Sequence, residues 1–387
     1  MDRARTGDAI ITGGAGYGKT LVIRELCNSL PNPPLLLAPT GKAARRLSDV
    51  TGRPARTIHS ALQWTGTRFM RQMPFDEGVI VVDEASMMDS WLAAALIRFV
   101  RGSIVLVGDE SQLPPVSPGS PFHDLVEIRP KLVVRLSICH RASAAVHIAS
   151  NMIRAGKVPP ALLRSDGEVW HVKETGSPAA TMNAISRYVE SGQYDPEQDV
   201  FIAPSYGQDD DNGHGIHAIN NRIKAHIIGD TGNKWDVGDR IMITKNFPQE
   251  DLWNGDAGKI THIAKQITIC LDRERGACHA DDLTRTLTDA QCRNMVLAYC
   301  ISVHKSQGSQ YRRVFFVCLH NQFRMLDRAL VYTAITRARE GCCVIGNINA
   351  FAKSINITRA RETCLRLFDG LDPEADVLRA GRDKATG

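Results

Sequence analysis

A glycine-rich turn near the start of the chain constrains the fold more than any other feature. The stretch AIITGGAGYGKTLVIRELCNSL predicts an apolar strand, then a turn with the pattern G-x-x-x-x-G-K-[ST], then a helix. Glycines let backbone N–H groups converge on phosphate oxygens, and a helix N-terminus attracts anions. A turn without a ligand is the alternative, which the flanking strand and helix disfavour. The sequence therefore predicts a nucleotide-binding site made by Gly13, Gly14, Ala15, Gly16, Tyr17, Gly18, Lys19 and Thr20.

Two adjacent acids end a later strand-like run, VIVVDEAS. In the nucleotide site, Lys19 can reach the β and γ phosphates, and Thr20 can ligate Mg²⁺. An acid at the end of a neighbouring strand can hold the same ion, and the next acid can accept a proton from the attacking water. We therefore predict a nucleotide with β and γ phosphates and Mg²⁺ as ligands, Asp83 with Thr20 as metal-binding residues, and Glu84 as the base. A solvated acidic pair at a strand end is the alternative.

Length and patterning predict an α/β protein with more than one domain. The chain has 387 residues, which exceeds what one hydrophobic core usually supports. Apolar strand-like runs alternate with helix-like stretches, as in parallel sheets with helices on both faces. The hydrophobic fraction of 43% and the charged fraction of 23% exclude the disordered and fibrous classes.

Composition also indicates which binding partners and which cellular location to expect. No apolar stretch is long enough to span a bilayer, and the first residues lack the apolar run of a signal peptide. We therefore expect no membrane partner and a location in the cytoplasm of a bacterial or phage-infected cell. The 10 cysteines include no CxxC pair, so they predict neither a zinc site nor a disulfide framework. A net charge of +5 permits a nucleic-acid partner without requiring one.

Seven motifs follow one another in a characteristic order: GGAGYGKT, LLLAPTGKAARRL, TIHSAL, VVDEASMM, LVGDESQLPPVSPG, ISVHKSQGSQY and VYTAITRARE. Together they resemble the motif series of superfamily 1B DNA helicases of the RecD/Dda type, from about Ala9 to about Gly346. The resemblance implies two RecA-like domains that bind ATP and single-stranded DNA, and ATP-driven translocation from 5′ to 3′. It also implies separation of duplex DNA forks, replication or recombination proteins as partners, and a monomer.

The resemblance extends to the order of the domains. Between VGDRIMITKNFP and ITICLDRERGACHADDL the pattern changes to short strands with polar turns, which indicates a small β insert. The expected parts are a first RecA-like domain over residues 1–133 with a pin-like hairpin insert at 63–77, a second RecA-like domain over 134–244 and 298–370, an SH3-like β insert over 245–297, and a charged tail over 371–387.

Several polar residues are candidates for the chemistry of ATP hydrolysis. Gln112 in GDESQLPP follows a buried strand, where its amide can hydrogen-bond a γ-phosphate or the attacking water and act as a phosphate sensor. By resemblance, Arg337 in AITRARE is an arginine finger, and Arg141 in ICHRAS is a second catalytic arginine. Gln307 and Gly308 in HKSQG are expected to approach the same phosphates. A surface salt bridge is the alternative role for each arginine.

Contacts with DNA are expected from loops at the carboxyl ends of the strands. The segment LQWTGTRFMRQMPFDEG predicts a β-hairpin. Its aromatic residues Trp64, Phe69 and Phe75 either pack into the first domain or form a wedge at the duplex junction. The histidines in TIHSAL and ISVHKS have an alternative role as helix-cap or core residues. The expected DNA-binding residues are Thr40, Gly41, Lys42, His59, Trp64, Phe69, Ser302, His304 and Lys305.

Two other classes of function compete with a helicase. One is a non-catalytic DNA-binding module that has kept the fold and lost turnover, which the intact Lys19, Asp83 and Glu84 disfavour. The other is the motor portion of a larger conjugative or recombination machine, in which strands are separated elsewhere. DNA-stimulated ATPase activity distinguishes the first of these from a helicase.

Overall fold

The computed structural model of the chain describes residues 7–139, 144–165, 168–204, 215–272, 283–319 and 325–359. The chain divides into two compact units. The described residues of 7–110 and 114–139 form the first unit, and those of 111–113 and 144–359 form the second. Within these described ranges, the structure contains no helix with the length and apolar character needed to cross a membrane.

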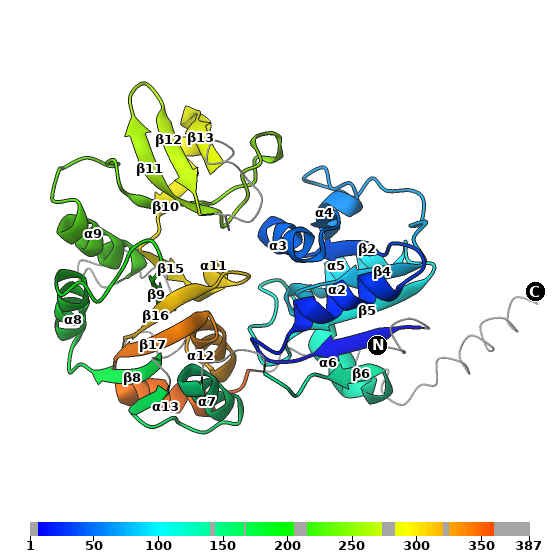
Figure 1. Ribbon diagram of the computed structural model, residues 1–387, viewed down its shortest axis with the longest axis horizontal. Coiled ribbons are helices and arrows are strands. Elements are labelled where there is room, and N and C mark those ends of the chain that lie inside the picture. The colour runs from blue at the N-terminus through cyan, green and yellow to red at the C-terminus, as the bar shows by residue number, and fades with distance from the viewer. Residues whose placement is uncertain are drawn as a thin grey trace, which may run out of the picture. The chain divides into compact units, whose positions relative to one another are not determined.

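The first unit is built on a six-stranded parallel sheet with the order β3-β2-β4-β5-β1-β6 (Figure 1). Its strands are β1 (Ala9–Thr12), β2 (Leu35–Ala38), β3 (Ala55–Thr57), β4 (Val79–Val82), β5 (Ser103–Gly108) and β6 (Val133–Arg135). Its helices are α2 (Lys19–Ser29), α3 (Gly41–Thr51), α4 (Ile58–Ala61), η1 (Ala85–Met87), α5 (Ser90–Ile97), α6 (Pro121–Ile128) and η2 (Pro130–Leu132).

Successive residues of these strands face opposite sides of the sheet, and each side has its own core. On one side, Ile11 of β1 packs in a cluster with Ile23 of α2 and Leu47 of α3. On the other side, Ile10 packs in a cluster with side chains of α4, α5 and α6, including Phe122. Strands buried on both faces explain the continuous apolar runs of the sequence and confirm the predicted α/β class.

The second unit contains a six-stranded sheet with the order β15-β9-β16-β17-β8-β7, in which only the β7–β8 pair is antiparallel. The strands are β7 (Leu162–Ser165), β8 (Glu168–Glu174), β9 (Val200–Ala203), β15 (Cys300–Ser302), β16 (Tyr311–Cys318) and β17 (Ala338–Gly346). The helices around it are α7 (Ala144–Arg154), α8 (Pro178–Glu190), α9 (Ile216–Ile227), α11 (Val303–Ser306), α12 (Arg328–Ile335) and α13 (Ile348–Asn356).

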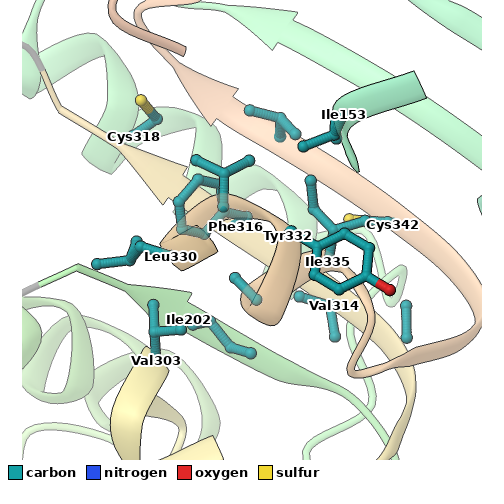
Figure 2. Close-up of a cluster of buried hydrophobic side chains, with 14 of the residues drawn as sticks. Ile153, Ile202, Val303, Val314, Phe316, Cys318, Leu330, Tyr332, Ile335 and Cys342 are labelled. Carbon is teal, nitrogen blue, oxygen red and sulfur yellow. The ribbon is translucent and has the colours of Figure 1, made fainter. Parts of the chain in front are cut away.

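This second sheet is also covered on both faces. Figure 2 shows one core, in which Tyr332 and Ile335 of α12 lie over Val314 and Phe316 of β16. The same cluster includes side chains of α7 and α13, whereas α8 and α9 pack on the other face around Phe315. Two parallel sheets, each flanked by helices, confirm the predicted two-domain fold class.

A separate five-stranded antiparallel sheet, with the order β13-β12-β11-β10-β14, lies within the second unit. Its elements are β10 (Arg240–Ile243), η3 (Pro248–Glu250), β11 (Ala257–Ile263), β12 (Ile267–Leu271), β13 (Thr284–Leu287), α10 (Asp289–Cys292) and β14 (Met295–Leu297). Residues such as Ile241, Ile260 and Ile269 give this small sheet its own core.

Two predicted boundaries differ from the strand pairing. The boundary between 244 and 245 assigns β10 to the second RecA-like domain, yet β10 pairs with β11 and β14 of the small sheet. The boundary between 133 and 134 falls inside β6, which pairs with β1 of the first sheet. Both strands are short and apolar, so hydrophobic pattern alone does not indicate to which sheet they belong.

Candidate functional site

The predicted phosphate loop joins β1 to α2. Gly16 has φ 85° and Gly18 has φ 74°, conformations that residues with a Cβ rarely adopt. A Cβ on Gly13 would lie 3.0 Å from Cβ of Leu136, so close packing also requires glycine there. These requirements explain the spacing of the glycines in the loop.

Lys19 lies at the first position of α2 and folds back over the loop. Its Nζ donates hydrogen bonds to the carbonyl oxygens of Gly13 at 2.7 Å and Gly14 at 3.0 Å. The helix starts after Gly18, and no side chain of the described loop caps its N-terminus. The ammonium group and the first N–H groups of an 11-residue helix therefore lie together, which is an arrangement suited to phosphate.

The acid pair follows β4 directly. Asp83 is buried, and its Oδ1 accepts a hydrogen bond of 2.9 Å from the backbone N–H of Glu84. Burial, followed by the neighbouring charge of Glu84, raises the pKa of Asp83 to about 6, while the charges of Lys19 and Arg46 act in the opposite direction. A buried carboxylate with a raised pKa favours a bound cation, because the cation stabilises the ionised form.

Three buried polar atoms lie at this same end of the sheet: Oγ1 of Thr12, Oε2 of Glu84 and Oγ of Ser86. Within the described residues, none of the three has a hydrogen-bond partner. Thr12 is the register partner of Gly108 on β5, and a Cβ on Gly108 would lie 3.1 Å from the backbone N of Ser86. Unsatisfied buried polar groups destabilise a fold by about 1–3 kcal/mol each, so this cluster suits a polar ligand or ordered water.

The protein groups of the site fit a metal ion only together with other ligands. Across the described residues, no group of three or more His, Cys, Asp and Glu side chains could hold a metal by itself. Mg²⁺ usually binds through one or two protein groups and substrate phosphates, so Thr20 and Asp83 fit it together with a nucleotide.

Two polar residues of the site, Ser86 and Thr12, were not among the candidates predicted from the sequence. Their only signal was a polar residue at the end of, or just after, a buried strand.

Gln112 lies in a short segment that follows β5. Gln112 is 4% exposed, and residues 111–113 belong to the second unit although β5 belongs to the first. The backbone N–H of Leu113 donates to Oγ1 of Thr333 on α12 at 2.8 Å. The segment that carries the predicted phosphate sensor is therefore fixed to a helix of the second unit.

Arg337, the predicted arginine finger, is only 3% exposed. Its Nε donates to the carbonyl oxygen of Thr333 at 3.0 Å, and its two Nη atoms donate to the Ser309 carbonyl and the Thr336 hydroxyl. Its burial disfavours the alternative of a surface salt bridge. Ser309 directly follows Gln307 and Gly308, so the structure brings Arg337 together with that predicted loop. Arg141 lies outside the described residues.

The predicted DNA-binding residues of the first unit have local structural roles. Oγ1 of Thr40 accepts a hydrogen bond from the backbone N–H of Ala43 and caps α3, which begins with Gly41 and Lys42. His59 lies on α4, where burial lowers its pKa and favours the neutral imidazole. Its ring centroid lies 6.1 Å from that of Trp64, so His59 is part of an aromatic cluster.

That aromatic cluster is built on the predicted hairpin. Trp64 and Phe69 form an antiparallel bridge, and the turn between them contains Gly66 with φ 99°. Their rings lie 4.8 Å apart, and Trp91 of α5 stacks on Phe69 at 4.6 Å and 28°. Trp91 is 53% exposed and was missed from the sequence, where a lone tryptophan in an apolar helix gives no functional signal. Phe75, in contrast, is buried in the same core as Ile10 and Phe122, which supports the alternative that it packs into the first unit.

The predicted DNA-binding residues of the second unit lie around α11. Oγ of Ser302 caps this helix by accepting a hydrogen bond from the backbone N–H of Lys305. His304 is exposed. Nζ of Lys305 donates to Oδ1 of Asn254 at 2.6 Å, in a turn of the small sheet, and burial lowers the pKa of Lys305. The structure therefore connects this motif directly to the β insert.

Comparisons with known proteins identify two family matches. Residues 3–174 match a family described as an AAA domain, and residues 297–345 match the UvrD-like helicase C-terminal domain. The chain is 31% identical over 374 residues to the ATP-dependent RecD2 DNA helicase of Deinococcus radiodurans, covering 91% of this chain and 48% of that protein. It is 30% identical over 416 residues to the RecBCD enzyme subunit RecD of Mycolicibacterium smegmatis, covering 93% of this chain and 72% of that protein. The chain thus spans about half the length of one relative and nearly three quarters of the other.

Solved structures agree with the fold. A Bacteroides Pif1 helicase in complex with ADP-AlF3 and ssDNA aligns with a TM-score of 0.55 and 17% identity, covering 100% of this chain and 95% of that one. The Pif1 helicase of Candida albicans aligns with a TM-score of 0.52 and 18% identity, covering 91% and 93% of the two chains. At these identities the likeness concerns the fold alone.

Proposed function

The chain belongs to the RecD family of superfamily 1B DNA helicases, and we propose that it is an ATP-dependent motor that moves 5′ to 3′ on single-stranded DNA and separates duplex strands. The observation that carries the proposal is that Lys19, after β1, and the acids Asp83 and Glu84, after β4, follow two strands that both pair in parallel with β5. The unsatisfied hydroxyls of Thr12 and Ser86 lie at the same end of the sheet. A site of this kind fits a nucleoside triphosphate better than any neutral ligand.

The residues of the first unit have distinct roles in this proposal. Backbone N–H groups of the loop and Lys19 bind the phosphates. Thr20 and Asp83 would hold Mg²⁺, which neutralises phosphate charge when it is bound. Glu84 accepts the proton of the attacking water. Its φ of 51° is unusual for a residue with a Cβ, and such strain is often found where a side chain must be directed into a functional site.

Two further residues, which belong to the second unit, are assigned roles in hydrolysis. We assign the phosphate-sensing role to Gln112, because its segment is bonded to α12 and so can transmit a change at the phosphate to that helix. Arg337 is assigned as the arginine finger, with Gln307 and Gly308 beside it. A buried guanidinium that donates to carbonyl and hydroxyl oxygens keeps its full charge, which phosphoryl transfer requires.

Single-stranded DNA and duplex forks are the proposed substrates. The loops at Thr40–Lys42 and Ser302–Lys305 offer hydroxyl, backbone and ammonium donors, which suit phosphates and carry no base information. The aromatic cluster of Trp64, Phe69 and Trp91 offers an apolar surface on a tight turn, which suits a strand-separating wedge. Replication or recombination partners, a monomeric state and a cytoplasmic location stay predictions.

The test measures ATP hydrolysis with and without single-stranded DNA, followed by unwinding of duplexes with a 5′ or a 3′ tail. We expect DNA-stimulated hydrolysis and unwinding from the 5′ tail. Lys19→Ala should abolish hydrolysis, because the phosphates lose their cation, while DNA binding without nucleotide persists. DNA binding without any hydrolysis by the natural protein would instead support a non-catalytic module. Unwinding only from the 3′ tail would overturn the proposed polarity.

A motor within a larger machine is a second candidate. The chain also matches a probable conjugal transfer protein TraA of Sinorhizobium fredii at 26% identity, covering 89% of this chain but only 31% of that protein. Translocation along single strands with no unwinding from either tail would favour this candidate over a self-sufficient helicase.

A further inference from the structure

We propose that a cavity in the second unit binds one nucleotide of the single strand, an inference that rests on the proposed DNA motor function. The cavity has a volume of about 380 Å³ and lies between α9, β14, β15 and the turn at 233–235. Binding sites for small molecules span roughly 300–1,000 Å³, so the size suits a single nucleotide and excludes a duplex.

The lining of the cavity combines two kinds of side chain. Its apolar side chains suit the face of a base. Its ammonium and amide groups suit a phosphate and base edges, and no acidic residue is among the described residues that line the cavity. The apolar lining residues include Ile216, Met242, Met295, Val296, Leu297 and Ile301, and the polar ones include His217, Asn221, Asn233, Lys234 and Lys305.

A preformed turn presents the basic edge of the cavity. Nζ of Lys224 forms ion pairs of 2.8 Å with both Asp236 and Asp239, and it also donates to the carbonyl oxygens of Asn233 and Lys234. Two carboxylates neutralise Lys224, so its role is to fix the turn rather than to bind an anion. The turn is therefore ordered before any ligand arrives, which lowers the entropic cost of binding.

The turn displays two residues suited to a nucleotide. Trp235 is half-buried and packs partly against the core of the small sheet, while it also lines the cavity. The exposed Lys234 places its Nζ 5.5 Å from the centroid of the Trp235 ring. The ammonium lies over the ring, so the turn presents a cation and an aromatic surface together, and these suit the phosphate and the base of one nucleotide.

Hydrogen bonds hold the other walls of the cavity. Asn220 of α9 donates to the carbonyl oxygen of Cys300 at 2.8 Å, and it accepts from the Cys300 backbone N–H at 2.9 Å. Lys305 reaches from α11 to Asn254 of the small sheet. The main sheet, α9 and the small sheet therefore all contribute to the lining of the cavity, and a nucleotide bound there would contact each of them.

The position of Lys305 favours a strand over a free nucleotide. Lys305 lines the cavity and also belongs to α11, whose cap residue Ser302 is a proposed DNA contact. A strand that follows α11 therefore passes the cavity, and its phosphates hold one nucleotide there at a high effective concentration. A free mononucleotide lacks those additional contacts.

The test uses the full chain and a thymidine-rich oligonucleotide that carries 5-iododeoxyuridine, a base that cross-links to adjacent aromatic residues under ultraviolet light. We expect mass spectrometry to place a cross-link at Trp235. Cross-links confined to other residues, from an oligonucleotide that binds tightly, would overturn the cavity assignment and leave the proposed helicase function intact. An oligonucleotide that does not bind at all would instead contradict the proposed function.

Binding titrations at several salt concentrations give an independent measurement. Lys234→Ala should weaken binding and reduce the slope of log K against log salt by about 0.7, the value for one phosphate contact of a single strand. Lys265→Ala, which removes an exposed lysine elsewhere on the small sheet domain, is the matched control and should leave both quantities unchanged.

Two variants separate stacking from folding. Trp235→Ala should weaken binding roughly 5- to 100-fold, the range for loss of one base–aromatic contact, whereas Trp235→Phe should retain most of the affinity. Equal affinity of both variants and the natural protein would overturn the proposal. Thymidine monophosphate should compete only weakly, and competition as strong as that of the oligonucleotide would show a site for free nucleotides instead.

Discussion

At the scale of single residues, the acid pair shows how a site can reduce the stability of the fold that carries it. The pKa of Asp83 is raised to about 6, chiefly by burial, so the folded protein binds its proton more tightly than the unfolded chain does. The stabilisation from this proton is complete below about pH 4 and is lost as pH rises through about 6. At neutral pH the ionised, buried carboxylate therefore destabilises the nucleotide-free protein.

We expect Asp83→Asn to raise the melting temperature of the nucleotide-free protein at pH 7.5. The gain should be on the order of 1–3 kcal/mol, because the amide has no charge to desolvate. At pH 4.5 the difference should shrink, since Asp83 is then mostly protonated. Thermal unfolding at both pH values measures this effect, with the exposed Asp76→Asn as a control. A variant that is less stable at pH 7.5 would show that hydrogen bonding, not charge, dominates at Asp83.

Glu84 makes a different prediction at the same scale. Glu84→Gln should bind ATP with little change and hydrolyse it roughly 100- to 10,000-fold more slowly, because an amide cannot accept a proton from water. Nucleotide binding by equilibrium titration and single-turnover hydrolysis separate the two effects. Hydrolysis at the natural rate would move the base to another residue.

At the scale of elements, the hairpin between α4 and β4 is anchored at its base and exposed at its tip. Arg71 donates to the carbonyl oxygens of Ala61, Met73 and Pro74, and its guanidinium lies 3.8 Å from the centroid of the Phe75 ring. The tip beyond this anchor carries the bridge between Trp64 and Phe69. Changes at the tip should therefore leave the fold of the first unit intact.

Replacing residues 64–69, which include the bridged Trp64 and Phe69, with a Gly-Ser turn should strongly reduce duplex unwinding and leave ATPase stimulation by single strands nearly unchanged. Opening a base-pair step costs a few kcal/mol, and a motor without a wedge should stall at the junction. Trp91→Ala should have a similar but smaller effect, because Trp91 supports Phe69 from α5. Shortening of an exposed loop elsewhere, such as 191–193, is the control. Unwinding at the natural rate by the shortened hairpin would place strand separation elsewhere in the chain.

The elements also show what the sequence could and could not reveal. The strand–loop–helix at Gly13 and the acids after β4 were predictable, because local pattern and chemistry agree there. The partnership of Trp91 with the hairpin was not, because it depends on a contact between residues far apart in the sequence. The cavity at Trp235 was hidden for the same reason, since its walls come from four segments that only the fold brings together.

At the scale of the whole molecule, separate cores predict separate cooperative units. The sheet of the first unit has clusters on its two faces, and the second unit has its own clusters around the main sheet and the small sheet. The small sheet is tied to the rest of its unit by the buried Lys224–Asp239 pair, so it should unfold together with that unit. Two transitions, rather than one or three, are therefore expected.

Scanning calorimetry should resolve these two transitions, with a calorimetric enthalpy larger than the van't Hoff enthalpy of a single step. A non-hydrolysable ATP analogue with Mg²⁺ should raise chiefly the melting temperature of the first unit, because the phosphate loop and both acids belong to that unit. At 100 times the dissociation constant the stabilisation is about 2.7 kcal/mol, which corresponds to roughly 5–15 °C for a unit of this size. In Lys19→Ala the analogue should shift neither transition. A single transition in the natural protein would contradict this division of the molecule. An analogue that raises only the melting temperature of the second unit would contradict it as well.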